Sequence, residues 1–441
     1  MNRNRITYNL AGLFVGPAPA TGYHILNSLG YLESDISQLG VSGATNIVFP
    51  VHRVTSFDYQ INTDRTRILN IGKIGVASDS ITTAPTVNFN FNYHNFGVLN
   101  ELRLGLYINY YSNTRGDNAF GANFSVPLLS GLTVRHPNEM WKTDAEGLYW
   151  PFNYRDCRNF FVAIKKDRED LSNQTTGKAG YLDVDAFGFG NCYMTSYRTS
   201  AAVGEFPQTS VSYIGENMMF YTSGSGISIP AIDIRTYRNY SGIKCCIPRP
   251  TESLALETVL LPGNITVSVS GESNFGVHFN DLIIQGYDIS MGLDRTPLTK
   301  LGYKSPLDRV IQFPVLVNLS FDIVAKNLLT GTLERLFIQD KNYNVDITVK
   351  NRSNVPQIYY FFRNAKYSNS TFQLNLNGQA STRFSFEAEI DPKDLSKGLF
   401  ISGVIDQPVI TSTGYLQYDN LTGNEQGYLL LENGGYILTE T

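Results

Sequence analysis

The sequence predicts a fold dominated by β-strands, with a few short helices, built as two tandem duplicated domains. Three observations support this prediction: a long internal repeat, an alternation of polar and apolar residues with a period of two, and an abundance of Tyr, Phe, Asn, Ser, Thr and Gly. Those residue types favour strands and turns over helices. A chain of 441 residues can hold two or three domains with sizeable cores.

The internal repeat relates two stretches of the chain at a single offset. Asp64-Arg65-Thr66 recurs as Asp294-Arg295-Thr296, an offset of 295 − 65 = 230, and the same offset relates Gly72 to Gly302. It also relates Asp58 to Asp288, Ile71 to Leu301, Val87 to Val317, Asn88 to Asn318 and Phe91 to Phe321. One offset held without a gap over such a span indicates an internal duplication.

Each copy of the repeat predicts two strands that have one dry face and one wet face. Apolar and polar residues alternate over 55–62 and 87–94 in the first copy, and over 285–292 and 317–323 in the second. A period of two is typical of half-buried strands. The segment that joins each strand pair is far longer than a tight hairpin turn. Ordered loops of that length are usually functional.

The chain divides into five predicted regions. We expect an N-terminal arm over 1–45, a first β domain over 46–230 with an insertion over 109–156, a linker over 231–264, a second β domain over 265–404, and a C-terminal tail over 405–441. The insertion contains both tryptophans, Trp141 and Trp150, and is expected to be rich in loops.

Further elements are expected in the same order in both domains. In the first domain the alternation continues over 102–108, and strands are predicted at 160–166, 181–187, 192–198 and 208–214. In the second domain strands are predicted at 345–350, 357–363, 371–377 and 382–389. Short helices are predicted at 252–261, where Pro262-Gly263 would end the helix, and at 328–338.

Charge and motif content argue against several classes of function. The net charge is −4, whereas a general nucleic-acid-binding surface would normally be basic. No apolar run is long enough to span a membrane, and the first residues do not form a typical cleavable signal peptide. The motifs GxxxxGK[ST], GxSxG and HExxH are missing, and the five histidines are dispersed. We therefore expect a protein that is not an enzyme and that has no cofactor and no metal site.

The cysteines and the repeated Asp-Arg pairs have simple structural interpretations. Cys157, Cys192 and the adjacent pair Cys245-Cys246 fit neither a disulfide framework nor a zinc site, so we expect buried free thiols. The pairs Asp64-Arg65 and Asp294-Arg295 are more typical of salt bridges at loop bases or between subunits than of an active site.

The duplicated pattern resembles the tail tube proteins of tailed bacteriophages. The residues behind this resemblance are Asp64-Arg65, Ile71-Gly72 and Pro85-Thr86-Val87, repeated as Asp294-Arg295, Leu301-Gly302 and Pro314-Val315-Leu316-Val317. The opening LAGLFVGPAPATGYH and the stretch from Gly204 to Met218 also resemble phage tail proteins. The similarity covers most of 46–230 and 265–400, and no single motif in it is diagnostic.

The resemblance implies a β-sandwich or half-barrel whose inner sheet joins the sheets of its neighbours to line a pipe. In that family, rings of six such domains stack into a tube through which DNA leaves the capsid, and the long loop after the first strand reaches the adjacent ring. The candidate ring-to-ring loop residues in this chain are Asp64, Arg65, Gly72, Asp294, Arg295 and Gly302.

The wet face of the predicted strands is the candidate wall of the channel. Its residues are Ser56, Asp58, Gln60, Asn62, Asn88, Asn90, Asn92, Asp288, Ser290, Asn318, Ser320 and Asp322. None of them is Lys or Arg, which suits a DNA conduit because cations would bind phosphate and slow passage. A sheet face turned to solvent would explain the same polarity, and the sequence does not decide which face is inward.

The predicted function is that of a tail tube subunit in the virion, assembled in the host bacterial cytoplasm. Two tube-type domains per chain would make a pseudo-sixfold ring from three chains, although six chains with one domain each in the ring remain an alternative. The expected partners are further copies of the chain, other tail proteins (terminator, baseplate or tip, and a sheath where one exists), and viral DNA that passes without specific binding. Alternative functions are a tail-tip or baseplate hub ring of the same fold, or a carbohydrate-binding β-sandwich module.

Overall fold

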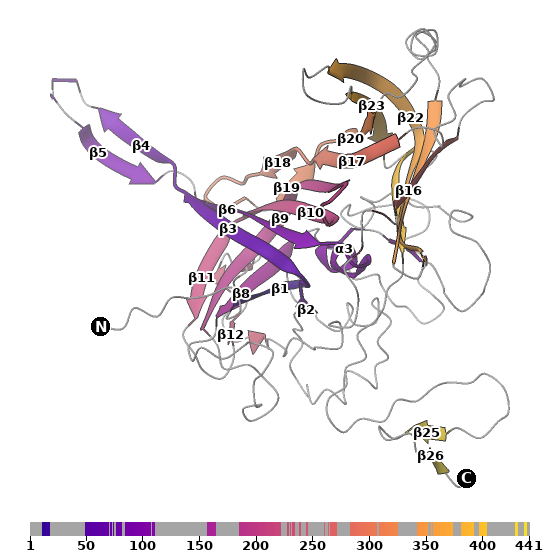
Figure 1. Ribbon diagram of the computed structural model, residues 1–441. Coiled ribbons are helices and arrows are strands. Elements are labelled where there is room, and N and C mark those ends of the chain that lie inside the picture. The colour runs from indigo at the N-terminus through magenta and orange to yellow at the C-terminus, as the bar shows by residue number, and fades with distance from the viewer. Residues whose placement is uncertain are drawn as a thin grey trace, which may run out of the picture. The chain divides into compact units, whose positions relative to one another are not determined.

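The computed structural model is an antiparallel all-β protein in the part of the chain that it describes (Figure 1). It describes 11–17, 49–106, 108–110, 157–164, 185–221, 265–270, 283–324, 342–373, 381–391 and 397–403, with gaps of one or two residues, and short pieces between 227 and 263 and within 428–438. The expected insertion and both expected helices lie wholly or mostly outside these residues. No helix among the described residues is long and apolar enough to cross a membrane.

The chain forms two compact units. The larger unit comprises 1–250 and 258–406, and the smaller comprises 251–257 and 407–441. The smaller unit contains a hairpin of β25 (Tyr428–Leu430) and β26 (Tyr436–Leu438). The two predicted β domains therefore both fall in the larger unit, and the boundaries proposed between them stay a prediction. Below, the first half means the described residues up to 221, and the second half those from 265 to 403.

Four strands of the first half form one layer in the order β3, β6, β10, β9. Their bounds are Val54–Asn62, Thr86–His94, Gln208–Gly215 and Asp185–Ala202. Four strands of the second half follow the same order, β17, β20, β23, β22. Their bounds are Ile283–Gly292, Val315–Val324, Ser381–Ile390 and Pro356–Gln373. The predicted strands at 55–62, 87–94, 208–214, 285–292, 317–323 and 382–389 are thus confirmed.

The remaining strands also pair in a matching way in the two halves. In the first half β1 (Ala11–Pro17) pairs with β8 (Arg158–Ile164), and β8 and β11 (Asn217–Tyr221) both pair with β9. In the second half β16 (Ile265–Ser270) pairs with β21 (Asn342–Lys350), and β21 and β24 (Gly398–Gly403) both pair with β22. The predicted strands at 160–166 and 345–350 are confirmed, whereas β1 was not predicted.

The long strands β9 and β22 each replace two shorter predicted strands. The sequence predicts separate strands at 181–187 and 192–198, and at 357–363 and 371–377, but each half has one continuous strand of 18 residues. Asn191 in β9 and Asn364 in β22 adopt left-handed backbone conformations, with φ of 52° and 55°. Asparagine tolerates this conformation better than most residues. A strand that bends at one residue can pair with different neighbours on each side of the bend.

An asparagine side chain supports the bend in both halves. The backbone N–H of Asn191 donates to Oδ1 of Asn159 at 3.2 Å, and the backbone N–H of Asn364 donates to Oδ1 of Asn344 at 3.1 Å. Asn159 lies in β8 and Asn344 in the matching strand β21. The two halves therefore share this backbone-to-side-chain hydrogen bond at the bend as well as a strand order.

The long excursions of the repeat are β-hairpins. In the first half β4 (Arg65–Leu69) pairs with β5 (Val76–Ile81), and in the second half β18 (Arg295–Leu298) pairs with β19 (Asp308–Ile311). Gly72 and Gly302 lie in the turns with φ of 87° and 88°, a backbone conformation that glycine adopts readily. Figure 1 shows β4 and β5 continuing outward from the ends of β3 and β6.

One predicted strand is wrong, because residues 99–104 form the short helix α3 (Leu99–Leu104). The alternation of Leu102, Leu104, Leu106 and Ile108 suggested a strand, but Leu104 and Leu106 are buried on either side of the helix end at Gly105, which has a φ of 98°. Only Ile108–Tyr110 form a strand, β7, which pairs in parallel with β24 of the second half.

Three further pairings involve strands of only two residues. β2 (Phe49–Pro50) pairs with β1, β12 (Ile227–Ser228) with β15 (Lys244–Cys245), and β13 (Ile232–Asp233) with β14 (Arg238–Asn239). Cys157 and Cys192 are buried and form no disulfide, as predicted for these two cysteines.

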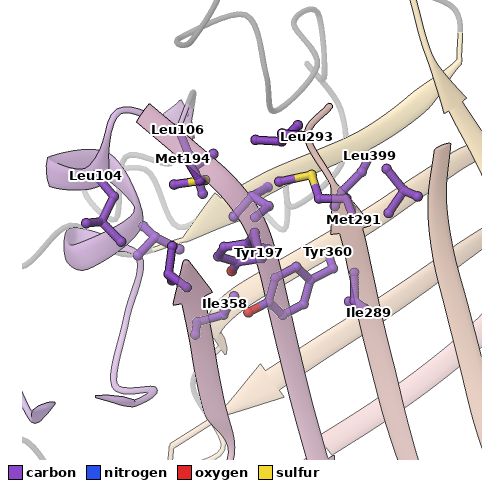
Figure 2. Packing of buried hydrophobic residues seen from close by; sticks show 14 of the residues in the cluster. Leu104, Leu106, Met194, Tyr197, Ile289, Met291, Leu293, Ile358, Tyr360 and Leu399 are labelled. Atoms are coloured by element: carbon purple, nitrogen blue, oxygen red, sulfur yellow. The ribbon is translucent and has the colours of Figure 1, made fainter. Parts of the chain in front are cut away.

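The two halves join edge to edge through β9 and β17, and we call this pairing the joint. Gly286–Gly292 of β17 lie antiparallel to Ser196–Ala202 of β9 in continuous register. Apolar residues of both halves pack into one cluster beside the joint (Figure 2), among them Met194 and Tyr197 from the first half and Ile289, Met291 and Tyr360 from the second. Burial of this shared apolar surface stabilises the joint together with its backbone hydrogen bonds.

Gly286 permits the close approach of the two strands at the joint. A Cβ atom added at Gly286 would lie 2.8 Å from the carbonyl oxygen of Ala201, whereas one added at Gly292, at the other end of the paired segment, would meet nothing within 4 Å. We predict that Gly286→Ala lowers the free energy of unfolding by about 1–3 kcal/mol. Gly292→Ala is the matched control and should change it by no more than about 0.5 kcal/mol. Urea titrations of the two variants check this, and equal stabilities would contradict it.

Candidate functional site: the polar sheet face and the joint

The twelve predicted channel residues lie on β3, β6, β17 and β20, on the side of the sheet opposite the apolar core. The alternation is clearest in β6, where Asn88 and Asn90 are exposed while Val87, Phe89 and Phe91 are buried. We call this side the polar face. It comprises the twelve predicted residues and the residues that continue their rows, strand by strand, across β9, β10, β22 and β23.

Neighbouring strands present these residues side by side. Asn92 lies directly opposite Ser56, and its Nδ2 donates to Ser56 Oγ at 2.9 Å. In the second half Ser290 lies opposite Asn318, and Asp288 lies opposite Ser320. Side chains on directly opposed positions of antiparallel strands are close enough to interact. The polar face therefore consists mostly of small hydrogen-bonding groups, interrupted by Ile214 opposite Asn88 and by the exposed Leu316.

The polar face also contains cations, which the expectation of a cation-free wall did not include: two arginines and, on β22, the exposed Lys366 opposite Glu387. Arg198 of β9 binds Asp288, with its Nε donating to Oδ2 at 2.8 Å. Arg383 of β23 binds Asp322 through two hydrogen bonds of 2.7 and 2.8 Å. Both arginine side chains are more than half exposed, and the hydrogen bonds that they donate to the aspartates raise the pKa of both. Each arginine thus lies beside one of the predicted aspartates and is paired with it.

Strand pairing at the joint continues the polar face from one half to the other. Ser200 of β9 lies opposite Asp288 of β17, and Arg198 lies opposite Ser290. Just beyond the paired strands the backbone N–H of Leu293 donates to the carbonyl oxygen of Thr195 at 2.7 Å. The Arg198–Asp288 ion pair crosses this same boundary. Backbone hydrogen bonds, an ion pair and a shared apolar cluster therefore all connect the two halves at the joint.

The six predicted ring-to-ring residues lie in the two hairpins. Arg65 and Arg295 begin β4 and β18, Asp64 and Asp294 precede them, and Gly72 and Gly302 lie in the turns. Asp64, Arg65 and Gly72 are exposed. The hairpin turns also expose apolar side chains fully: Ile71, Ile74 and Leu301. These three residues are not among the predicted site residues, although Ile71 and Leu301 are related by the repeat.

The second hairpin contacts the first half of the same chain. The Nε of Arg295 donates to the carbonyl oxygen of Met194 at 2.6 Å, and its guanidinium lies 5.4 Å from the ring centroid of Tyr193. Arg309 of β19 forms an ion pair with Glu216, and both side chains are largely buried. Burial raises the pKa of Glu216, while the charge and hydrogen bond of Arg309 act in the opposite direction. Arg295 therefore helps to hold the hairpin against its own chain.

A buried carboxyl group lies beside the apolar cluster at the joint. Glu101 of α3 accepts a hydrogen bond from Tyr93 Oη at 2.8 Å and one from Tyr197 Oη at 3.4 Å. Thr199 Oγ1 lies 3.5 Å from Tyr360 Oη, so polar groups from both halves meet here. Burial raises the pKa of Glu101 to about 7, although the three hydrogen bonds it takes part in lower it. No sequence signal distinguished this glutamate from a surface residue.

The outer edge of β3 differs from the edge of its counterpart β17. Tyr59 and Ile61 are 41% and 49% exposed, whereas Ile289 and Met291, which lie 230 positions later, are 0% and 2% exposed. The difference arises because β17 has neighbours on both sides, β20 and β9, whereas among the described strands β3 pairs only with β6. An unpaired strand edge with exposed apolar residues favours pairing with another chain.

No cluster of three or more His, Cys, Asp or Glu side chains among the described residues could hold a metal ion. The chemistry that the polar face and the strand edges support is hydrogen bonding and ion pairing.

Comparisons with known proteins leave the function to be inferred from the chain itself. No protein-family model and no curated protein matches the sequence. Among the solved structures that match, one is a chain of the anti-feeding prophage baseplate, from a six-fold symmetrised cryo-EM structure. The two chains are 15% identical with a TM-score of 0.24, and the match covers 32% of this chain and 93% of the other. A likeness at this level carries no argument about function.

Replacement of Glu101 should change how stability depends on pH. Because the folded-state pKa of about 7 lies above the usual 4.5, the stability that the protonated group contributes is complete below pH 4.5 and is lost as the pH rises through 7. We predict that the stability difference between the wild type and Glu101→Gln falls by about 3 kcal/mol from pH 4.5 to pH 8. Denaturant unfolding across this range measures the difference, with the exposed Glu205→Gln as a surface control. A difference that does not vary with pH would show that Glu101 is not held in a buried, protonated state.

Proposed function

We propose that this protein is a structural subunit of a phage-type tail tube, in which three chains close a pseudo-sixfold ring and the rings stack. The observation that supports this most strongly is the joint. Within one chain, a sheet edge of the first half is already hydrogen-bonded to a sheet edge of the second half in continuous register. A repetition of this contact between chains would extend the sheet without limit or close it into a ring.

Ring closure would also remove the exposed strand edge. A sheet with an unpaired edge tends to pair with other chains, and closure is the arrangement that eliminates edges altogether. In the described part of the chain, β3 has a free side with exposed Tyr59 and Ile61. A closed ring of identical chains gives every such edge a partner. The matching strand orders of the two halves support a duplicated tube-type domain in which both halves take part in the ring.

The polar face would line the channel. Its amide and hydroxyl groups stay hydrated, and its two arginines are paired with aspartates, so they add little net attraction for phosphate. DNA could then pass without specific binding. The exposed apolar residues Ile71, Ile74 and Leu301 at the hairpin turns would contact the adjacent ring, and the last rings would meet other tail proteins.

Electron microscopy of the purified protein tests the assembly. We expect negative-stain images to show hollow tubes built from stacked rings. Isolated rings would favour a tail-tip or baseplate hub instead, and monomers that bind glycans would favour a carbohydrate-binding module.

Replacement of Ile71 and Leu301 by Ser should shorten the tubes or leave single rings, because it removes apolar contact between rings while leaving strand pairing intact.

Lysines placed on the polar face should convert a non-adhesive channel into one that retains DNA. We predict that assembled Asn90→Lys/Asn318→Lys particles co-sediment with short duplex DNA at physiological salt, that the bound DNA is released as salt increases, and that wild-type particles retain little. The control is Val203→Lys/Phe206→Lys, which adds the same charge at exposed turn positions. Equal retention by the two variants would mean that the polar face does not line the channel.

A further inference from the structure

We propose that the contact between chains is formed by β3 of one copy and the C-terminal part of β22 of a second copy, in the register of the joint. This inference rests on the proposed ring, and it names the two edges and the residue pairs that form it. The partner is a second copy of the same chain, because both edges belong to strands whose counterparts pair with each other inside the chain.

The first edge is identified by the repeat. Gln60 of β3 and Ser290 of β17 are related by the offset of 290 − 60 = 230, and both strands pair on one side with the second strand of their own half. On its other side Ser290 lies opposite Arg198 of β9. Gln60 has no strand opposite it on that side among the described residues. A strand of a second copy could therefore pair with β3 on this side, and its residue opposite Gln60 would correspond to Arg198.

The second edge is found by following the register across the sheet. Arg198 of β9 lies opposite Ser210 of β10, and Thr371 of β22 lies opposite Arg383 of β23. Ser210 lies opposite Asn92 of β6, and Arg383 lies opposite Asp322 of β20. These two positions are related by the same offset, 322 − 92 = 230. Thr371 thus occupies in the second half the place that Arg198 occupies in the first. The geometry pairs Gln60 of one copy with Thr371 of the next.

Irregularities in the strands fall at the same places and support this alignment. The pairing of β9 with β10 shifts register between Ser212 and Tyr213, and the pairing of β22 with β23 shifts between Tyr367 and Asn369. Ser212 is opposite Ser196, and the matching Ser385 is opposite Asn369. A bulge fixes register, because a slip of one residue would move every side chain to the other face.

The contact can form in only one sense along the chain. The edge of β9 is occupied by β17 of the same chain, whereas residues 369–373 of β22 pair with β23 alone among the described strands. Of the two matching edges, β9 and β22, only that of β22 is therefore open to β3 of a second copy in the described part of the chain. Such a head-to-tail contact uses two different surfaces, so it generates a ring or an open chain rather than a two-fold dimer.

The first hairpin would accompany β3 onto the second copy. Within the chain Arg295 of the second hairpin donates to the carbonyl oxygen of Met194. Arg65 is the repeat-related residue of the first hairpin, and the register places Tyr367 of β22 where Met194 lies in β9. Arg65 of one copy is thus positioned to donate to the carbonyl oxygen of Tyr367 in the next. In the assembled ring the first hairpin would then be held by an arginine-to-carbonyl hydrogen bond, as the second hairpin is within the chain.

Disulfide trapping tests the register. Directly opposed residues of antiparallel strands have Cα atoms about 4.5–5.5 Å apart, which is within the range that a disulfide spans. The full-length variant Gln60→Cys/Thr371→Cys should form covalent multimers under mild oxidation, resolved as a ladder on a non-reducing gel. In the control Ile61→Cys/Thr371→Cys the thiols lie one residue out of register and on opposite faces, and it should yield at most one tenth as much. Ser290→Cys/Arg198→Cys should close within a single chain.

The outcomes separate this contact from the proposed function. Multimers from the first variant and not from the control support the contact. Rings or tubes in the microscope, with no more multimers than the control gives, would overturn the β3–β22 register while leaving the tube function in place. Monomeric particles without cross-links would overturn both the contact and the tube function.

A second variant, Ile61→Lys, tests the same edge. Ile61 is half exposed, so the substitution should leave the far-ultraviolet circular dichroism spectrum unchanged. It should reduce assembly, measured by light scattering, at least tenfold, because a charge on the edge of β3 opposes pairing with another strand.

Discussion

The pairing of β9 with β17 is the interaction on which the rest of this structure depends. It brings two separately ordered half-sheets into one continuous sheet, and the apolar cluster behind it contains side chains from both. The same boundary includes the Arg198–Asp288 pair on the polar face and the Arg309–Glu216 pair at the second hairpin. The joint therefore gives, within one chain, the strand pairing by which a next copy could be added.

Alternating strands impose the second constraint, because each strand must present one face to the core and one to water. The large aromatic residues Phe89, Phe91 and Tyr213 stack behind the sheet, while small amides and hydroxyls occupy the other side. Polar residues on that side need no partner beyond water and each other. The arginines there are compensated by aspartates on the adjacent strand, which keeps the face polar without making it strongly cationic.

The sequence predicted the all-β class and most strands because alternation and the repeat report local preferences directly. It did not reveal that 181–187 and 192–198 are one strand, since the bend depends on a left-handed Asn191 held by the side chain of Asn159, a contact between distant residues. The alternating leucines at 102–108 were mistaken for a strand because helix α3 is only six residues long, too short to show a helical period. Of the candidate site, the polar residues could be selected from alternation, but Arg198, Arg383 and Glu216 become visible only when the register across strands is known.

A cryo-EM reconstruction of the assembled protein, at a resolution that separates strands, is the decisive experiment for the proposed ring. We expect three chains per ring, with both halves of each chain lining the bore through the polar face and with β3 of each chain hydrogen-bonded to β22 of its neighbour. A ring in which only one half of each chain reaches the bore, or in which β3 remains exposed to solvent, would contradict it.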